Sequence, residues 1–581
     1  MPFALPYLPW LNEKQSCTFF NPAILVCCLT LIITGVSRPV VQDKAGQTAI
    51  PHTGVTFRTS DPMLQKLYDE AERKAQWNIA WFGPYQVLVE GAGYDNVWLE
   101  TQPMGGTMYA KRNLTVARNN IQIFMDYQRA DGRLAGMISR AGDSLFAHYG
   151  WFQGYCFPMP ALELYYWLDK DTAYLQQLYQ VLEAFDRYLW KTRDSDQDGC
   201  LESWCICDTG EDHCVRFNQS PWFWPYDEAP TSDRLAALPE SVLAEMGLGK
   251  KKPAKSFTTP LPIESMDVMS YAYSGRDVLA RIAEILGNGR AAYWRQQADA
   301  VRIKLKERLW NKKKHACYDL DKNNRVMAIL LHNNLRCMYF GSFDQQMADA
   351  FVRHHLLNPE EFWTPMPLPS IAANDAAFRN VAGNDWSGQP QGLTFQRSIR
   401  ALENYGHCAE VTMIGQKFLQ AIGDSMKFTQ QFDPFTGKVD QTKDGYGPSI
   451  LAALEFISRL YGIHLSQDRV LWSCLDDAFE HDYTQQWGKR SFRMATQGRQ
   501  VHCSINGKKA FAFSRGIRII SDNKGRIIEA VGIDIKPQQT IITHRGKTVS
   551  LTVEPNAVYD GKKNFSRMRQ VEFIRPELHG R

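Results

Sequence analysis

The chain has 581 residues, of which 44% are hydrophobic and 12% aromatic, so it is long enough to bury one or two large cores. Its 66 lysines and arginines nearly balance its 62 acidic residues, and no basic or acidic block stands out. This balance argues against nucleic acid or a polyanion as a partner. The 16 tryptophans are more than packing alone usually needs, and exposed tryptophan faces are common in carbohydrate sites.

The N-terminus carries an uncharged apolar run over residues 22–36. This run is too short for a comfortable membrane span and has the length of the hydrophobic part of a signal peptide. Only one cation, Lys14, precedes it, so an uncleaved membrane anchor stays open. We therefore expect residues 1–38 to be a signal peptide or N-terminal anchor, and the protein to be exported to the periplasm or the extracellular space.

Between residues 61 and 462 the sequence has the pattern of helical hairpins. Residues 63–81 place Leu64, Leu67 and Ala71 on one face, which is the apolar stripe of an amphipathic helix. Similar stretches follow at 105–128, 151–168, 171–192, 266–286, 290–311, 327–340, 344–356, 388–405, 408–422 and 447–462.

Two kinds of helix alternate in this region. Residues 157–168 are apolar nearly all round, as expected for an inner ring, whereas residues 293–309 keep one polar face, as expected for an outer ring. Two concentric rings of helices would form a toroid.

After residue 462 the sequence pattern changes. Hydrophobic and polar residues alternate around the turns 506–507, 522–525 and 545–547. This pattern predicts a small antiparallel β-sandwich over residues 466–581.

Three segments between the predicted helices carry more polar and aromatic residues than turns require. They are residues 94–106, residues 207–226 and the stretches 384–388 and 428–437, which we treat as one segment. All three lie at the ends of predicted helices, so a toroid could bring them to one mouth. We expect the functional site there.

Residues 207–217 (CDTGEDHCVRF) hold three carboxylates, a histidine and an arginine. Inverting cleavage of a glycosidic bond needs one acid to protonate the leaving oxygen and one base to activate water, with the two carboxyls about 6.5–9.5 Å apart. Like-charge repulsion from Asp208 and Glu211 would raise the pKa of one carboxyl here, while Arg216 and His213 would keep others ionised. The segment could therefore supply the acid.

Structural roles without catalysis compete with the interpretation of residues 207–217 as the source of the acid. Residues 208–211 resemble a capping box, so the segment could be a helix N-cap followed by solvated acids. Upstream, residues 194–199 match the start of a calcium loop, but its twelfth position is Cys205 instead of a bidentate glutamate, which favours a plain acidic turn. Cysteines crowd between residues 200 and 214 without zinc spacing, and some could pair in an oxidising compartment. We expect no metal ion and no cofactor.

Four segments, in order along the chain, point to a known family: residues 98–100 (WLE), 208–217 (DTGEDHCVRF), 386–406, which begin WSG and end YG, and 432–437 (FDPFTG). They resemble the WxxD, ESGxDxSPR, WxG...YG and YDPxTG motifs of glycoside hydrolase family 63 and of the related trehalases and mannosylglycerate hydrolases. The resemblance covers roughly residues 90–465. It implies a mainly α fold in which residues 39–465 form an (α/α)6 barrel, with the β-sandwich of residues 466–581 appended.

The resemblance also implies roles for individual residues. Asp212 would be the general acid, with Arg216 as its charge partner, and Trp98, Glu100 and Trp386 would line the sugar pocket. Trp222 and Trp224 add stacking surfaces beside the acidic cluster. The side chains that we expect to contact the substrate are Trp98, Glu211, Arg216, Trp222, Trp224, Asp385 and Trp386.

One position departs from the family pattern. Where the family has its catalytic base, a glutamate three residues before the aspartate of the DP pair, this sequence has Gln430. A neutral amide can orient a water molecule but cannot accept its proton. Three explanations stay open: the base comes from another loop, with Glu100 first and Asp385 or Glu211 as further candidates; phosphate replaces water as the nucleophile; or the protein binds glycans without cleaving them.

The sequence thus predicts an exported glycosidase that acts on an α-linked glycoside with inversion, with Asp212, Glu100 and Gln430 at its catalytic centre. Its partner would be an oligosaccharide or a small glycoside. Anchoring to a membrane through the N-terminal apolar segment stays open. A glycan-binding protein without catalysis and an inverting phosphorylase are the alternatives.

Overall fold

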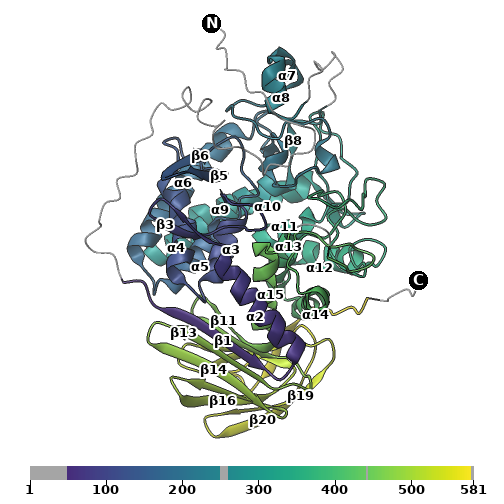
Figure 1. Cartoon of the computed structure of the whole chain (residues 1–581). Coiled ribbons are helices and arrows are strands. Elements are labelled where there is room, and N and C mark those ends of the chain that lie inside the picture. The colour runs from purple at the N-terminus through teal and green to yellow at the C-terminus, as the bar shows by residue number, and fades with distance from the viewer. Residues whose placement is uncertain (1–48, 249–258, 440–442, 577–581) are drawn as a thin grey trace.

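The computed structural model describes residues 49–248, 259–439 and 443–576 (Figure 1). The predicted signal peptide or anchor at residues 1–38 lies outside the described residues. Within the described part, no helix has the length and apolar character that crossing a membrane would require.

Helices are the main regular structure of the chain as far as residue 461. They are α2 (Pro62–Trp77), α3 (Thr101–Tyr109), α4 (Leu114–Asp126), α5 (Pro158–Trp167), α6 (Thr172–Thr192), α7 (Ser232–Ala237), α8 (Glu240–Glu245), α9 (Met266–Leu286), α10 (Ala291–Arg308), α11 (Asn333–Phe340), α12 (Gln345–Phe351), α13 (Gly392–Glu403), α14 (Cys408–Ser425) and α15 (Gly447–Tyr461).

The predicted helices 171–192, 266–286 and 447–462 match the structure to within one residue, whereas several others are shorter than predicted or divided. The stretch 105–128 is two helices, α3 and α4, because the Asn113 side chain caps a new helix by accepting the backbone N–H of Val116. The stretch 151–168 is helical only from Pro158, where the proline occupies the first helical position. Of the residues left outside helices, Gln153 and Gly154 belong to the site described below.

Short strands that the sequence did not reveal lie between the helices. They are β2 (Ile79–Phe82), β3 (Tyr85–Leu88), β4 (Val97–Trp98), β5 (Met137–Ala141), β6 (Ser144–His148), β7 (Glu202–Ser203), β8 (Ile263–Glu264), β9 (Trp310–Asn311) and β10 (Ala316–Cys317). They pair as three hairpins or bridges, β2 with β3, β7 with β8 and β9 with β10, and as a sheet β4-β5-β6. Each of these strands has two to five residues, too few for alternation to be visible in the sequence.

Two antiparallel sheets form the rest of the chain. One has the order β1-β13-β14-β15-β16-β19-β20 and the other the order β11-β12-β17-β18-β21-β22. Their strands are β1 (Thr53–Thr59), β11 (Ile463–Ser466), β12 (Arg469–Cys474), β13 (His481–Trp487), β14 (Arg490–Gln497), β15 (Gln500–Ile505), β16 (Lys508–Ser514), β17 (Ile517–Asp522), β18 (Ile527–Gly532), β19 (Gln538–His544), β20 (Lys547–Val553), β21 (Ala557–Asp560) and β22 (Ser566–Gln570).

The two sheets pack face to face. Trp472 on β12 is fully buried, and its ring centre lies 6.0 Å from that of Phe492 on β14 and 5.4 Å from that of Phe511 on β16. The predicted turns at residues 506–507, 522–525 and 545–547 connect consecutive strands. The predicted boundary at residue 465 falls inside β11, and β1, which precedes the helices, pairs with β13 along its whole length.

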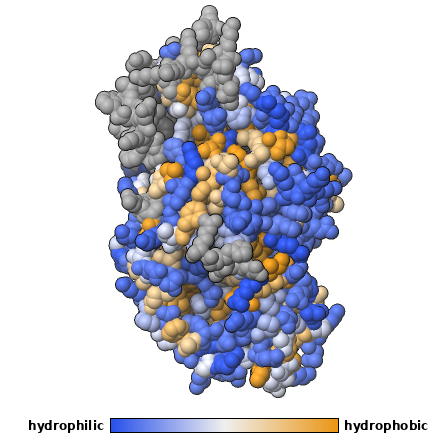
Figure 2. Space-filling model, turned by 90° about the vertical axis from the view of Figure 1, so that its right-hand side faces the viewer, coloured by the Kyte–Doolittle hydropathy of each residue, from blue (hydrophilic) through white to orange (hydrophobic). Residues whose placement is uncertain are grey.

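Helices α2 and α15 lie between the sheets and the other helices (Figure 1). The surface is largely hydrophilic on the face that Figure 2 shows, with hydrophobic residues gathered in a central band.

At the junction between the helices and the sheets, Lys111 donates to Glu455 (2.6 Å) and to Ser458 (2.8 Å) on α15, and its backbone oxygen accepts from Gln485 on β13 (3.0 Å). Arg459 also binds Glu455 (2.8 Å). Buried charges thus join Lys111 to α15, and a neutral hydrogen bond joins Lys111 to β13.

Replacing Glu455 by glutamine tests this junction. The variant should lose about 3–5 kcal/mol of unfolding free energy, because the ammonium of Lys111 would stay buried without its counter-charge. Thermal and urea unfolding followed by circular dichroism would measure the loss. The Glu284→Gln variant, which removes an exposed ion pair with Arg295, should melt almost like the unmutated protein. Equal effects of the two substitutions would contradict the role of this junction.

Candidate active site

A cavity lies among the loops that connect the helices. Each of the three segments singled out in the sequence contributes to its wall, so the structure brings them to one place. The lining residues are Glu90, Tyr94, Trp98, Glu100, Gln153, Gly210, Asp212, Asn384, Trp386, Leu393, Gln430 and Tyr446.

Asp212 is buried in this wall, and a second loop holds it in place. Its Oδ2 accepts a hydrogen bond from the amide of Asn384 (2.5 Å), and its backbone oxygen accepts from the N–H of Trp386 (3.0 Å). Asn384 has a φ of +69°, a left-handed conformation that asparagine adopts more readily than most residues. The backbone at Asn384 is thus shaped to direct its side chain towards Asp212.

Gln430 belongs to the same hydrogen-bonded chain. Its Nε2 donates to Oδ1 of Asn384 (2.5 Å), and its Oε1 accepts from the hydroxyl of Tyr94 (2.7 Å). The indole N–H of Trp386 also donates to Oδ1 of Asn384 (3.1 Å). Because each amide has one acceptor end and one donor end, these contacts fix the order Tyr94, Gln430, Asn384, Asp212 along the wall.

Glu100 is held in a different way. Its carboxylate pairs with the buried guanidinium of Arg397 and lies between Gly154 and Gly210, where a methyl group on either glycine would overlap it. Both glycines have a φ of +69°, which residues with a Cβ rarely adopt. Burial raises the pKa of Glu100, and the positive charges of Arg397 and Arg336 offset part of that rise.

Glu90 is a third carboxyl group in the cavity wall, and the sequence analysis did not select it. Burial raises its pKa to about 8, a hydrogen bond with Tyr446 lowers it in part, and the nearby charges of Glu100 and Asp212 raise it further. Glu90 follows β3 and precedes a Gly-Ala-Gly turn. The sequence signal that could have identified Glu90 is an acidic residue at the end of an apolar strand and directly before a glycine turn.

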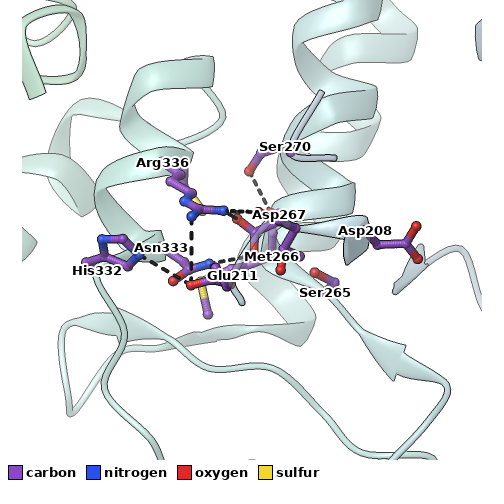
Figure 3. A network of polar contacts seen from close by, with 12 residues as sticks. Asp208, Glu211, Ser265, Met266, Asp267, Ser270, His332, Asn333 and Arg336 are labelled. Carbon is purple, nitrogen blue, oxygen red and sulfur yellow. Dashed lines mark hydrogen bonds and ion pairs between the residues drawn. The ribbon is translucent and has the colours of Figure 1, made fainter. Parts of the chain in front are cut away.

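Glu211 and Arg216 lie in a buried network beneath the Asp212 loop and do not line the cavity. Arg216 pairs with Glu211, with Asp267 (3.0 Å) and with Asp319 (2.6 Å). Figure 3 shows Glu211 directed towards His332, Asn333 and Arg336, which come from α11 and the residue before it. The distances from Glu211 are 3.3 Å to His332 and 3.0 Å to Asn333.

The charges of this network act on one another. Burial disfavours the ionised form of Glu211, but Arg216 and Arg336 outweigh it and hold the pKa of Glu211 well below its usual range. Asp319 shows the opposite balance: burial raises its pKa to about 6, although Arg216 lowers it. Arg216 forms ion pairs with Glu211, Asp267 and Asp319. Asp212, by comparison, accepts a hydrogen bond from the side-chain amide of Asn384.

Asp208, the remaining carboxylate of the loop, is also structural. It accepts from Arg193 (2.5 Å) and from the backbone N–H groups of Trp204 (2.7 Å) and Phe152 (3.1 Å). Figure 3 shows its side chain pointing away from Glu211. Of the three acidic residues in the segment 208–212, Asp212 is the one that lines the cavity.

Three more predicted site residues lie outside the cavity wall. Asp385 accepts from Arg379 (2.9 Å) and from the backbone of Ser387 (2.8 Å), and so stabilises its own loop. Trp222 is half-buried, edge-on to His213. Trp224 is 1% exposed and belongs to a second apolar cluster. Trp98, Glu100, Asp212, Trp386 and Gln430 do meet in the cavity, together with Tyr94, Gln153, Asn384 and Tyr446, which were not selected.

The other motifs of the sequence have local roles. The carboxylates of Asp194, Asp196 and Asp198 come within 4.8 Å of one another, the one such group among the described residues that could hold a metal ion. Their oxygens already serve the turn, since Asp194 accepts from Gly199 (3.0 Å) and Asp198 from Cys200 (2.7 Å). The ten cysteines in the described part of the chain are buried free thiols.

Comparison with known proteins gives one family. The profile of the mannosylglycerate hydrolase MGH1-like glycoside hydrolase domain matches residues 107–448, more than half of the chain. This range includes Asp212, Asn384, Trp386 and Gln430. No curated protein matches the chain.

Solved structures resemble this one at low sequence identity. The family 63 mannosylglycerate hydrolase from Thermus thermophilus in complex with Tris is 19% identical, covers 68% of this chain and 100% of its own, and superposes with a TM-score of 0.53. A sialidase is 14% identical (81% and 42% covered, TM-score 0.59), and a family 78 rhamnosidase of Bacillus sp. GL1 is 10% identical (78% and 42%, TM-score 0.52). At these identities the likeness concerns the fold, that of six-hairpin glycosidases.

Replacing Arg216 by methionine tests the network beneath the loop. The three carboxylates around Arg216 would lose a shared counter-charge, so we expect a loss of about 3–5 kcal/mol of unfolding free energy. Hydrogen exchange should accelerate in residues 208–217 more than in the sheets. Arg325→Met, which removes an exposed pair with Asp321, is the matched control and should change neither quantity. Unaltered exchange in Arg216→Met would show that the network does not hold the loop.

Proposed function

The chain belongs to the mannosylglycerate hydrolase MGH1-like family of glycoside hydrolases, and from this premise we propose that it cleaves an α-linked glycoside with inversion. We further propose that its helices close into an (α/α)6 barrel, with the cavity at the mouth. The observation that carries the activity is Asp212, a buried carboxyl that faces a cavity walled by Trp98 and Trp386. A carboxyl beside aromatic faces can protonate a leaving oxygen while the rings contact the sugar.

The surroundings of Asp212 suit a proton donor. Its Oδ2 receives the Asn384 amide, which fixes the direction of the carboxyl group and leaves the role of proton donor to the other oxygen, Oδ1. The proton would pass from Asp212 to the glycosidic oxygen as the bond to the anomeric carbon breaks. The reaction needs neither a cofactor nor a metal ion.

The Asn384 carboxamide also limits the distance between the side chains of Asp212 and Gln430. Two hydrogen bonds of 2.5 Å join it to Asp212 and to Gln430. With the width of one amide between them, Oδ2 of Asp212 and Nε2 of Gln430 are roughly 7 Å apart at most. The Asn384 amide fills the direct line between the two groups, so Asp212 and Gln430 border the same part of the cavity.

Glu100 has a supporting role in this proposal. Its carboxylate is fixed by Arg397 and by the contacts with Gly154 and Gly210, and it faces the cavity. A carboxylate fixed in this way can accept hydrogen bonds from sugar hydroxyls with little loss of side-chain entropy. The chain would meet its substrate, an oligosaccharide or a small glycoside, outside the cell, since we also propose that residues 1–38 direct export.

The amide at Gln430 favours one rival function, glycan binding without cleavage. A panel of aryl α-glucoside, mannoside, galactoside and rhamnoside substrates separates the two, with NMR following the anomer released first. Release of the β-anomer supports inverting hydrolysis. Binding of glycans without turnover across the panel contradicts it, and a sugar 1-phosphate that forms only with added phosphate identifies a phosphorylase.

Asp212→Asn should lower kcat by about 10²–10⁴-fold on substrates with poor leaving groups, because the amide has no proton to give. Glycan binding, measured by calorimetry, should survive. The loss should shrink for dinitrophenyl glycosides, whose leaving group departs without protonation. An equal loss on both kinds of substrate would contradict the role of acid.

Asn384→Gly tests the residue that positions Asp212. Glycine tolerates the φ of +69°, so the substitution removes the carboxamide without straining the backbone. We expect kcat to fall by about 10²-fold, because the carboxyl of Asp212 would no longer be oriented, while KM changes little. Circular dichroism should match that of the unmutated protein. A change confined to KM would make Asn384 a binding residue instead.

A further inference from the structure

Glu90 occupies the cavity wall with a rigid backbone. Its carbonyl oxygen accepts from the N–H of Gly447 at the start of α15 (2.6 Å) and from the side chain of Asn78 (3.4 Å). The chain then turns tightly, since Gly91 and Tyr94 exchange backbone hydrogen bonds of 3.2 and 2.9 Å. One turn therefore presents both Glu90 and Tyr94 to the cavity.

This turn lies beside Gln430, the position where the family pattern has its catalytic base. Tyr94 donates to Gln430, and its ring centre is 6.0 Å from that of Tyr446, the hydrogen-bond partner of Glu90. Asn384 separates Gln430 from Asp212, as described above. Glu90, Tyr94, Gln430 and Tyr446 thus form one wall, which we call the tyrosine wall.

Glu100 lies beside the Asp212 loop. Its carboxylate is in contact with Gly210, two residues before Asp212 in the same loop. In an inverting reaction, water enters from the face of the sugar ring opposite to the acid. Glu90 belongs to the wall that holds Gln430, the position where the family pattern places the base that activates this water, whereas Glu100 contacts the loop that carries the acid.

The charges around the two glutamates also differ. Glu100 has the guanidinium of Arg397 as its direct partner. Glu90 faces the hydroxyl of Tyr446 and the carboxylates of Glu100 and Asp212, with Arg397 contributing the smallest of these influences. A buried carboxyl without a directly paired cation holds a proton tightly, so Glu90 can accept a proton from water once it is ionised, at a pH above about 8.

We propose that Glu90 is the general base of the inverting hydrolysis, an assignment that rests on the proposed function. Glu90 would take one proton from a water molecule while the water oxygen forms a bond to the anomeric carbon. The bond from that carbon to the glycosidic oxygen breaks, and Asp212 gives its proton to that oxygen. One water is consumed, and exchange with solvent returns a proton from Glu90 to Asp212.

The test uses the full chain and whichever aryl α-glycoside of the panel the unmutated protein cleaves. Glu90→Gln should lower kcat by about 10³-fold, since no carboxylate would accept the proton of water. In Glu90→Ala, sodium azide should restore turnover and give the β-glycosyl azide, because azide attacks without losing a proton. Glu100→Ala is the matched control: it should weaken binding, and azide should not restore it.

A second readout isolates the base. In the background Asp212→Asn, an α-glycosyl fluoride needs no acid, so its rate should rise with pH along a single limb as Glu90 loses its proton. Adding Tyr446→Phe should move that limb to higher pH, because the hydroxyl of Tyr446 lowers the pKa of Glu90. A structural role for Tyr446 would change the rate and leave the limb in place.

The outcomes separate the two proposals. Turnover by the unmutated protein that survives within tenfold in Glu90→Gln, or azide rescue of Glu100→Ala instead of Glu90→Ala, overturns the assignment of the base and keeps the glycosidase. Absence of turnover on every glycoside and fluoride by the unmutated protein overturns both.

Discussion

The structure of the site depends on the ion pairs of Arg216. Its guanidinium meets the carboxylates of Glu211, Asp267 and Asp319, all buried, and such charges are tolerated only when they are paired. Because Glu211 is held below the loop by this pairing, the next residue, Asp212, is directed towards the cavity. The same acidic segment thus supplies an anchor and a cavity residue, and the position of one determines the position of the other.

A second constraint joins loops that are far apart in the sequence. Asn384 touches Asp212 across 172 residues and Gln430 across 46. The left-handed backbone of Asn384 costs stability unless the surroundings favour it. Here the carboxyl of Asp212, the amide of Gln430 and the indole of Trp386 bind its side chain. The glutamine that replaces a carboxylate is therefore useful in the wall, because its amide can both donate to Asn384 and accept from Tyr94, which a carboxylate could not do.

The sequence predicted what depends on local pattern and missed what depends on distant contacts. Helices such as 266–286 were found because their apolar stripe is long, and the turns of the sandwich because glycine and asparagine mark them. Asp212 was found through a motif. The pairing of Arg216 with Asp267 and Asp319 joins residues 51 and 103 positions apart, and no spacing rule predicts it. Glu90 was missed because a lone glutamate after a strand looks like any solvated acid.

Three carboxyl groups line one cavity, and their partners distinguish them. Glu100 has a guanidinium, Asp212 an amide and Glu90 a phenol hydroxyl. In a poorly solvated site, the partner sets how tightly each group holds a proton: a cation favours the ionised form strongly and a neutral donor only weakly. The two glutamates can therefore differ in proton affinity, although both are buried carboxyl groups in one cavity. This difference arises from the choice of neighbour, a guanidinium for Glu100 and a phenol hydroxyl for Glu90.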